Sequence, residues 1–128
     1  MNAARRHRVL VVEDEFLVRI DLVDELEMAG FNVLEAGTAA EAVKILEGDR
    51  EIAAVFTDIN LPGTMDGIAL AECVRKRWPP TVIVICSGNN LTDLRPIPPD
   101  IDFLPKPYEI NTLDRVVKGA FAKLSDLA

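Results

Sequence analysis

Long apolar runs are absent from the sequence: the longest, Ile52–Phe56 and Val82–Cys86, are five residues each. A helix that spans a membrane needs about 20 consecutive apolar residues, so membrane insertion is not expected. The apolar stretch Val9–Val12 follows the basic start of the chain, but Glu13 ends it too early for a signal peptide. We therefore expect a cytoplasmic protein.

Cysteine and positive charge are also scarce. The two cysteines, Cys73 and Cys86, lack the spacing of metal ligands, which favours free thiols buried as small hydrophobic side chains in a reducing compartment. Lys and Arg number 14 against 21 Asp and Glu, and the net charge of −7 argues against a nucleic-acid partner. Residues 1–7 are expected to form a basic, flexible tail.

The composition is that of a globular domain. Of the 128 residues, 49% are hydrophobic and 27% are charged. A chain of this size buries roughly two-thirds of its surface on folding, which is enough for a core without disulfides or metals. Because no internal repeat or linker divides the sequence, we expect a single domain over residues 1–128, with its core at about 8–124.

Short apolar runs alternate with longer amphipathic stretches. The short runs predict strands at Arg8–Val12, Phe31–Glu35, Ile52–Thr57, Thr81–Ile85 and Ile101–Leu104. Helical spacing predicts helices over 15–28, over 38–48, from Asp66 to the prolines at 79 and 80, and from Ile110 to Leu124. The apolar face of the first helix is expected to comprise Phe16, Ile20, Val23 and Leu26. Trp78 is expected to lie within the third helix, together with Ile68, Ala71 and Val74.

This alternation predicts an α/β fold, in which a parallel sheet is covered by helices on both faces. In a doubly wound sheet with the strand order 2-1-3-4-5, the first and third strands lie side by side. The segment 89–100 contains three prolines and is interpreted as a loop, with at most a short helix near Thr92–Arg95.

Polar residues stand at the carboxyl ends of four of these strands. Glu13 and Asp14 follow the first strand, Asp58 the third, Ser87 the fourth and Lys106 the fifth. Ligands of open parallel sheets bind outside the carboxyl ends of the strands, where the strand order reverses. We therefore expect these side chains to converge on one crevice.

Three carboxylates in one crevice repel each other, by about 4 kcal/mol for two charges about 4 Å apart at an effective dielectric of ~20. Such a cluster must raise its pKa values or recruit a cation, and oxygen ligands suit Mg²⁺. A carboxylate beside Mg²⁺ can accept a phosphoryl group. Lys106 would add positive charge, and the Ser87 hydroxyl could donate a hydrogen bond to a phosphoryl oxygen.

Each of these residues also has a purely structural explanation. Glu13 and Asp14 could cap the helix that follows them. Asp58 could be a turn residue, and Ser87 begins an ordinary turn pair. Lys106 is more unusual, because a proline stands on each side of it. The coincidence of all these positions at strand ends favours a functional site.

The residues in this order resemble the receiver domain of two-component response regulators, over about Arg8 to Leu124. The matching stretches are Val9–Glu15, Asp58–Gly67, Ser87-Gly88 and Phe103–Tyr108. The resemblance implies a flavodoxin-like fold. It also implies that Asp58 is the phosphoacceptor, receiving a phosphoryl group from a histidine kinase or a phosphotransfer protein.

The resemblance implies further roles around Asp58. Glu13 and Asp14 would bind Mg²⁺ together with Asp58, and the backbone carbonyl of Asn60 would complete the protein ligands. The longer stem of Glu13, where Asp is commoner, should still reach a water molecule bound to the metal. Asn60 and Asn89 stand two residues after Asp58 and Ser87, at positions that influence how fast the phosphate is hydrolysed.

On the other side of the site, the resemblance implies that Ser87 and Lys106 contact the phosphoryl group. Phe103 matches the aromatic residue that turns inward in the active state, although an ordinary apolar role in the sheet is equally open. Phosphorylation would move Ser87 toward the phosphoryl group and let Phe103 fill the vacated space, switching a surface that binds other proteins.

The sequence departs from the common receiver pattern in two segments. The loop from Asp58 to Gly67 is one residue longer than the commonest spacing. The stretch between Ser87 and Lys106 is short and rich in proline, so we expect the fourth helix of the family to be shortened or remodelled.

The leading hypothesis is a stand-alone response regulator in a phosphorelay, which is no enzyme beyond its own phosphorylation and dephosphorylation. A receiver that docks without phosphorylation is the first alternative. A Mg²⁺-dependent phosphohydrolase would need an acid or base such as a carboxylate at the position of Asn60. Flavin binding is disfavoured because Glu13 and Asp14 stand where a phosphate loop would be.

Overall fold

The computed structural model describes residues 7–88, 100–106 and 108–126. The strands are β1 (Arg8–Val12), β2 (Asn32–Ala36), β3 (Ile52–Asp58), β4 (Val82–Ser87) and β5 (Asp102–Pro105). The helices are α1 (Phe16–Met28), α2 (Ala39–Gly48), α3 (Gly67–Arg77) and α4 (Ile110–Asp126). Asn89 and the short helix expected near Thr92–Arg95 lie outside the described residues.

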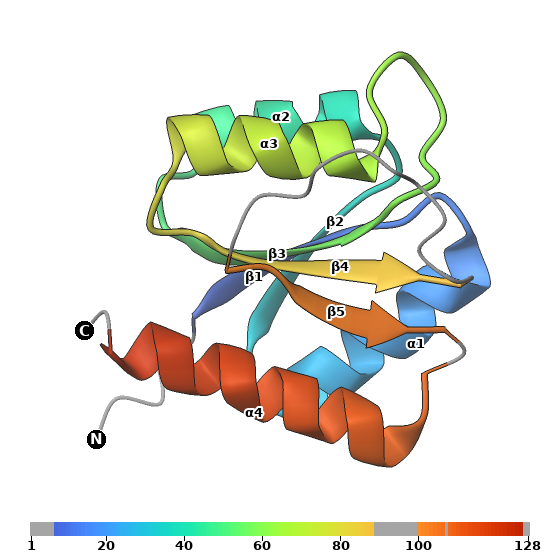
Figure 1. Cartoon of the computed structure of the whole chain (residues 1–128), viewed down its shortest axis with the longest axis vertical. Helices are drawn as coiled ribbons and strands as arrows, with labels where there is room; N and C mark the ends of the chain where they lie inside the picture. The colour runs from blue at the N-terminus through green and yellow to red at the C-terminus, as the bar shows by residue number, and fades with distance from the viewer. Residues whose placement is uncertain (1–6, 89–99, 107, 127–128) are drawn as a thin grey trace.

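The strands form one parallel sheet in the order β2-β1-β3-β4-β5, with α2 and α3 over one face and α1 and α4 over the other (Figure 1). This confirms the doubly wound α/β fold and the strand order predicted from the sequence. In the described part of the chain, no helix is both long enough and apolar enough to cross a bilayer.

The central strands are buried on both faces. In β1, Val9 and Val11 point to the core under α1 and α4, whereas Leu10 and Val12 point to the core under α2 and α3. Residues 9–12 are at most 1% exposed. Two buried faces explain why the strands read as continuous apolar runs instead of alternating patterns.

Four of the five strands end later along the chain than the apolar pattern predicted, whereas β1 has its predicted bounds. β3 includes Asp58, which pairs with Cys86, and β4 extends to Ser87, which pairs with Pro105. β2 and β5 are shifted by one residue relative to their predicted ranges. The apolar pattern marks buried side chains, whereas a strand continues as long as its backbone groups find partners on the neighbouring strand.

The capping signals located two helix starts correctly. The Thr38 side chain accepts a hydrogen bond from the backbone N–H of Glu41 at 3.1 Å, and Asp66 accepts one from Ala69 at 2.9 Å. The end of α3 differs from the prediction, because Trp78 lies just outside the helix as its C-terminal cap. A residue that precedes proline avoids the helical conformation, and Pro79 follows Trp78 directly.

The apolar face of α1 also differs from the prediction. Its buried residues are Leu22, Val23 and Leu26, whereas Phe16 is 60% exposed. The first turn of α1 stands at the carboxyl edge of the sheet, past the strands that cover the rest of the helix (Figure 1). Phe16 and its neighbour Leu17 belong to this turn, and both side chains are exposed.

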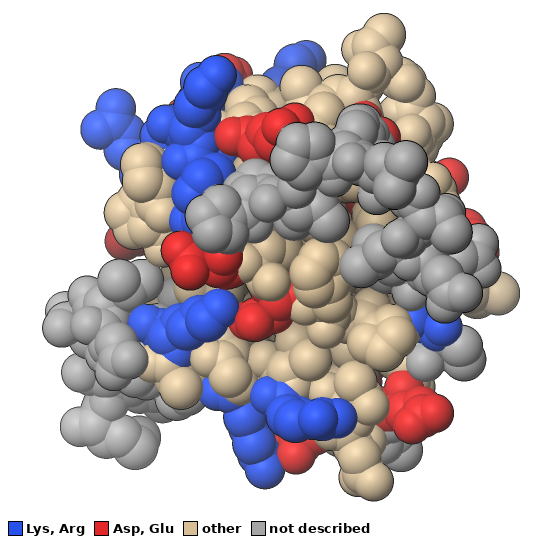
Figure 2. Space-filling model, viewed as in Figure 1, with Lys and Arg blue, Asp and Glu red and all other residues tan. Residues whose placement is uncertain are grey.

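Charges are unevenly distributed over the surface. Figure 2 shows Lys and Arg side chains gathered near the C-terminal end of α3. The last turn of that helix carries Arg75, Lys76 and Arg77, where positive charge interacts favourably with the helix dipole. This basic cluster lies toward the amino ends of the strands, at the end of the sheet opposite to the carboxyl edge.

The turn between β3 and α3 brings two backbone segments into close contact at Gly67. The N–H of Gly67 donates to the carbonyl oxygen of Ile59 at 2.8 Å. A β-carbon on Gly67 would lie 1.8 Å from the carbonyl oxygen of Asp58. Only glycine fits here, because any side chain would push the end of β3 out of place.

We expect Gly67→Ala to lower the free energy of unfolding by more than about 3 kcal/mol, because backbone atoms must move to admit the methyl group. Gly119→Ala is the matched control, since a β-carbon at this position in α4 meets nothing within 4 Å. Alanine in a helix should stabilise the control by about 0.5–1 kcal/mol. Urea denaturation measures both, and equal small effects would contradict the close contact.

Candidate functional site

The sheet register brings the ends of three strands together. Val12 of β1 pairs with Thr57 of β3, so the next residues, Glu13 and Asp58, follow side by side. Ser87 of β4 pairs with Pro105 of β5, and Lys106 comes next in the chain. The side chains of Glu13, Asp58 and Lys106 meet at this carboxyl edge, as predicted.

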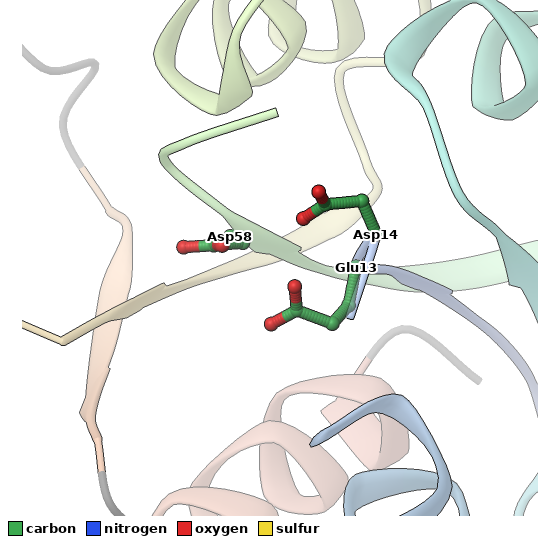
Figure 3. A group of neighbouring side chains, drawn as sticks. All are labelled: Glu13, Asp14 and Asp58. Atoms are coloured by element: carbon green, nitrogen blue, oxygen red, sulfur yellow. The ribbon is translucent and has the colours of Figure 1, made fainter. Parts of the chain in front are cut away.

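Three carboxylates lie together at the ends of β1 and β3 (Figure 3). Glu13, Asp14 and Asp58 each offer an oxygen atom, and these atoms all lie within 4.8 Å of one another. Their exposure differs, because Glu13 is 2% exposed and Asp58 is 7% exposed, whereas Asp14 faces solvent. The cluster therefore has a buried floor and an open side through which a ligand can enter.

Lys106 reaches two of the carboxylates. Its ammonium nitrogen Nζ donates a hydrogen bond to Oε1 of Glu13 and lies 3.3 Å from Oδ2 of Asp58. Burial on its own would lower the pKa of Lys106, but the hydrogen bond to Glu13 and the charge of Asp58 outweigh it and raise that pKa. The lysine therefore stays charged and partly neutralises the cluster.

Glu13 is the most enclosed of the acidic groups. Burial raises the pKa of its carboxyl group, and the negative charge of Asp58 raises it further, against the lowering effect of the Lys106 and Glu15 hydrogen bonds. One lysine thus does not fully compensate three carboxylates in a water-poor site.

This donor set fits a hard divalent cation. The three ligand groups are carboxylates, and a cation such as Mg²⁺ prefers oxygen ligands and keeps several water molecules, which the exposed side of Asp14 permits. The fourth predicted ligand is the backbone carbonyl of Asn60. Asn60 is exposed in the loop just after β3, and its role in metal binding stays a prediction.

Two further predicted residues stand on β4 and β5. Ser87 is the last residue of β4, and the position of its side chain is outside the described structure. Phe103 stands on β5 with 38% of its surface exposed. Their switch roles stay predictions, as does the effect of Asn60 and Asn89 on dephosphorylation.

Two neighbours of the site were not predicted from the sequence. Arg19 on α1 donates to the carbonyl oxygen of Glu13 at 2.7 Å and to the Glu35 carboxylate at 2.9 Å. Tyr108 interacts with the thiol of Cys86, whose pKa burial raises to about 12. A basic residue one turn into α1 was a usable signal for Arg19, whereas nothing in the sequence linked Tyr108 to Cys86.

We expect Asp58→Asn to stabilise the protein without divalent cations by about 1 kcal/mol, because it removes one of three mutually repelling charges while Glu13 retains Lys106. Asp24→Asn on the exposed side of α1 is the control and should change little. The measurement is urea unfolding in EDTA. A loss of stability specific to Asp58→Asn would mean that Asp58 contributes more through its interactions than it costs by repulsion.

Comparison with known proteins identifies the family. A profile described as "Response regulator receiver domain" matches residues 9–118. Sensor kinase CckA of Brucella abortus is 36% identical over 119 residues, which cover 90% of this chain and 12% of that protein. Transcriptional regulatory protein PdtaR of Mycobacterium tuberculosis is 32% identical over 129 aligned positions, which cover 98% of this chain and 62% of PdtaR.

Solved structures agree with the sequence relatives. A crystal structure of a response regulator receiver protein from Sinorhizobium medicae matches with a TM-score of 0.80 and 25% identity, over 95% of this chain and 97% of that one. The chain spans only part of CckA and of PdtaR, and the shared part is the receiver region. The chain belongs to the response regulator receiver domain family.

Proposed function

We propose that this receiver is switched by phosphorylation of Asp58 within a two-component pathway. The observation that carries the proposal is the meeting of three carboxylates and one lysine at the ends of β1, β3 and β5. The donor would be a phosphohistidine of a histidine kinase or a phosphotransfer protein. An oxygen of Asp58 attacks the phosphorus atom, the O–P bond forms, the N–P bond breaks and the histidine nitrogen keeps the bonding electrons.

Several residues of the chain would contribute to this transfer in different ways. When bound, Mg²⁺ supplies positive charge to the phosphoryl oxygens. Asp14 and Asp58 are the ligands best placed to hold it, because one is exposed and the other is the attacking group. Lys106 lies 3.3 Å from Asp58 and can contact a phosphoryl oxygen from the other side. Asp58 is buried, so bulk water has little access to it.

The output would be a change at the β4–β5 edge. A phosphoryl group adds roughly −1.5 to −2 charges to a cluster that already repels negative charge. Ser87 would be drawn to it, and Phe103, partly exposed at rest, would turn inward. The phosphorylated state shifts the population between these arrangements and so alters binding to a downstream protein.

We propose that the protein does not turn over external substrates. The position two residues after the phosphoacceptor is Asn60, which is a weaker proton acceptor than a carboxylate. Self-phosphorylation and autodephosphorylation are the reactions we assign to it. We place it in the cytoplasm and propose that it acts through contacts with other proteins.

Millimolar Mg²⁺ should raise the melting temperature by about 5 °C or more at 100 times its dissociation constant, because a ligand that binds only the folded state stabilises it. Asp14→Asn should remove most of this shift, since Asp14 is the exposed ligand of the cluster. Differential scanning fluorimetry with matched ionic strength tests both. An unchanged melting temperature across the Mg²⁺ titration would argue against the cation site.

Acetyl phosphate with Mg²⁺ should add the mass of one phosphoryl group to the wild-type chain and none to Asp58→Ala. Asp24→Ala, an exposed aspartate on α1, is the control for unspecific modification and should behave as the wild type. Intact-protein mass spectrometry is the readout. A wild-type chain that binds Mg²⁺ and gains no adduct would favour a receiver that docks without phosphorylation.

A further inference from the structure

A cavity of about 310 Å³ lies at the end of the molecule opposite to the carboxylate site. Its lining comes from the C-terminal end of α3, the turn into β4, the residue two positions before β5 and the last turns of α4. Figure 1 shows that these segments meet at one end of the sheet. The carboxylate cluster stands at the other ends of the strands, so the cavity shares no residue with it.

Arg75 of α3 lines this cavity and is fixed by the backbone of the turn into β4. Its Nη1 donates to the carbonyl oxygen of Pro79 at 2.6 Å and to that of Thr81 at 3.2 Å. Within the described ranges no carboxylate pairs with the guanidinium group. Arg75 therefore brings a positive charge to the cavity that no acidic side chain neutralises.

A second nitrogen atom of the same guanidinium group lacks a partner. Nε of Arg75 is buried and makes no hydrogen bond in the part of the chain that the structure describes. A buried donor without an acceptor is costly, and native proteins pair nearly all such groups. Nε and Nη2 together form an edge that binds a carboxylate through two parallel hydrogen bonds, and the contacts of Nη1 leave this edge unused.

Two further charged side chains line the cavity. Lys123 on α4 donates to Asp102 at 2.8 Å, which uses one of the three donors of its ammonium group. Asp100 is exposed. Together with Arg75 they leave the lining with one net positive charge. A singly charged carboxylate matches this lining, whereas Asp100 would repel a phosphate group, with its roughly −1.5 to −2 charges, more strongly.

The other walls of the cavity are largely apolar. Pro79, Pro80 and Val82 supply them. The volume of about 310 Å³ falls at the lower end of the range for small-molecule sites, about 300 to 1,000 Å³. Because the lining offers apolar surface beside the charged groups, an apolar body attached to the carboxylate would gain free energy by leaving water.

We propose that this cavity binds a small monocarboxylate with a compact apolar body. The two carboxylate oxygens accept hydrogen bonds from Nε and Nη2 of Arg75, the ammonium group of Lys123 adds positive charge, and the body packs against Pro79 and Pro80. The site is independent of the proposed function, because it uses none of the residues assigned to the cation or to the phosphoryl group.

The test follows the Nε–H signal of Arg75 in ¹H–¹⁵N NMR spectra of the full chain, assigned by its loss in Arg75→Lys. Benzoate is the probe, and acetate, inorganic phosphate and chloride are compared with it at matched ionic strength. Benzoate gives the unpaired N–H an acceptor, so it should move this signal to higher ¹H frequency in a saturable titration. Acetate should bind about tenfold more weakly, because it lacks the apolar body.

Three substitutions test the lining and keep both carbonyl contacts of Arg75. Asp100→Asn removes the negative charge and should tighten benzoate binding about threefold. Asparagine also suits the positive φ of 69° at this position. Lys123→Gln should weaken binding by a similar factor. Lys76→Gln is the matched control and should change little, because Lys76 is an exposed neighbour of Arg75 that does not line the cavity.

An Nε–H signal that benzoate leaves in place up to tens of millimolar would overturn the proposal. Equal shifts with chloride would also overturn it, since they would indicate unspecific ion pairing at the basic end of α3. Tighter binding of phosphate than of benzoate would refute the assignment to a monocarboxylate. None of these results bears on Asp58, because the titrations need neither Mg²⁺ nor phosphorylation.

Discussion

The contact of Lys106 with Glu13 and Asp58 is the interaction on which the site depends. Without it, the three carboxylates at the ends of β1 and β3 would face each other without the ammonium group that contacts two of them. The pKa of Glu13 is nevertheless raised, mainly because the carboxyl group is buried and to a smaller extent because Asp58 is negatively charged. Under the proposed function, the remaining negative charge of the cluster would favour the binding of a divalent cation.

An unfavourable cluster of this kind needs stability from elsewhere in the molecule. The two cores on either side of the sheet supply it, because the central strands are buried on both faces and the sheet is parallel throughout. The same sheet fixes the geometry, since the pairing of Val12 with Thr57 sets where Glu13 and Asp58 emerge. Gly67 then allows the chain after Asp58 to turn back without displacing it. Core and turn together hold like charges close.

The fold and the members of the site could be predicted from the sequence because both rest on local patterns. Apolar runs marked the five strands, the alternation with helices indicated a doubly wound sheet, and the polar residues at four strand ends marked Asp14, Asp58 and Lys106 as neighbours. Which of these side chains is buried and which of them contacts the lysine could not be predicted, because burial and side-chain contacts depend on the tertiary structure. The exposure of Phe16 was missed for the same reason: helical spacing gives the direction of a side chain and not whether a strand lies opposite it.

The position of Lys106 also explains why a signal from this site would leave through β5. The lysine follows directly after β5, a strand of four residues whose one pairing partner in the described part of the chain is β4. Short edge strands with one neighbour are less costly to displace than central strands such as β1 and β3. Under the proposed function, a phosphoryl group on Asp58 would pull on Lys106 and hence on β5, while Glu13 stays bound to α1 and β2. The rigid side of the site would then hold its shape, and the movement would fall on the strand that carries Phe103.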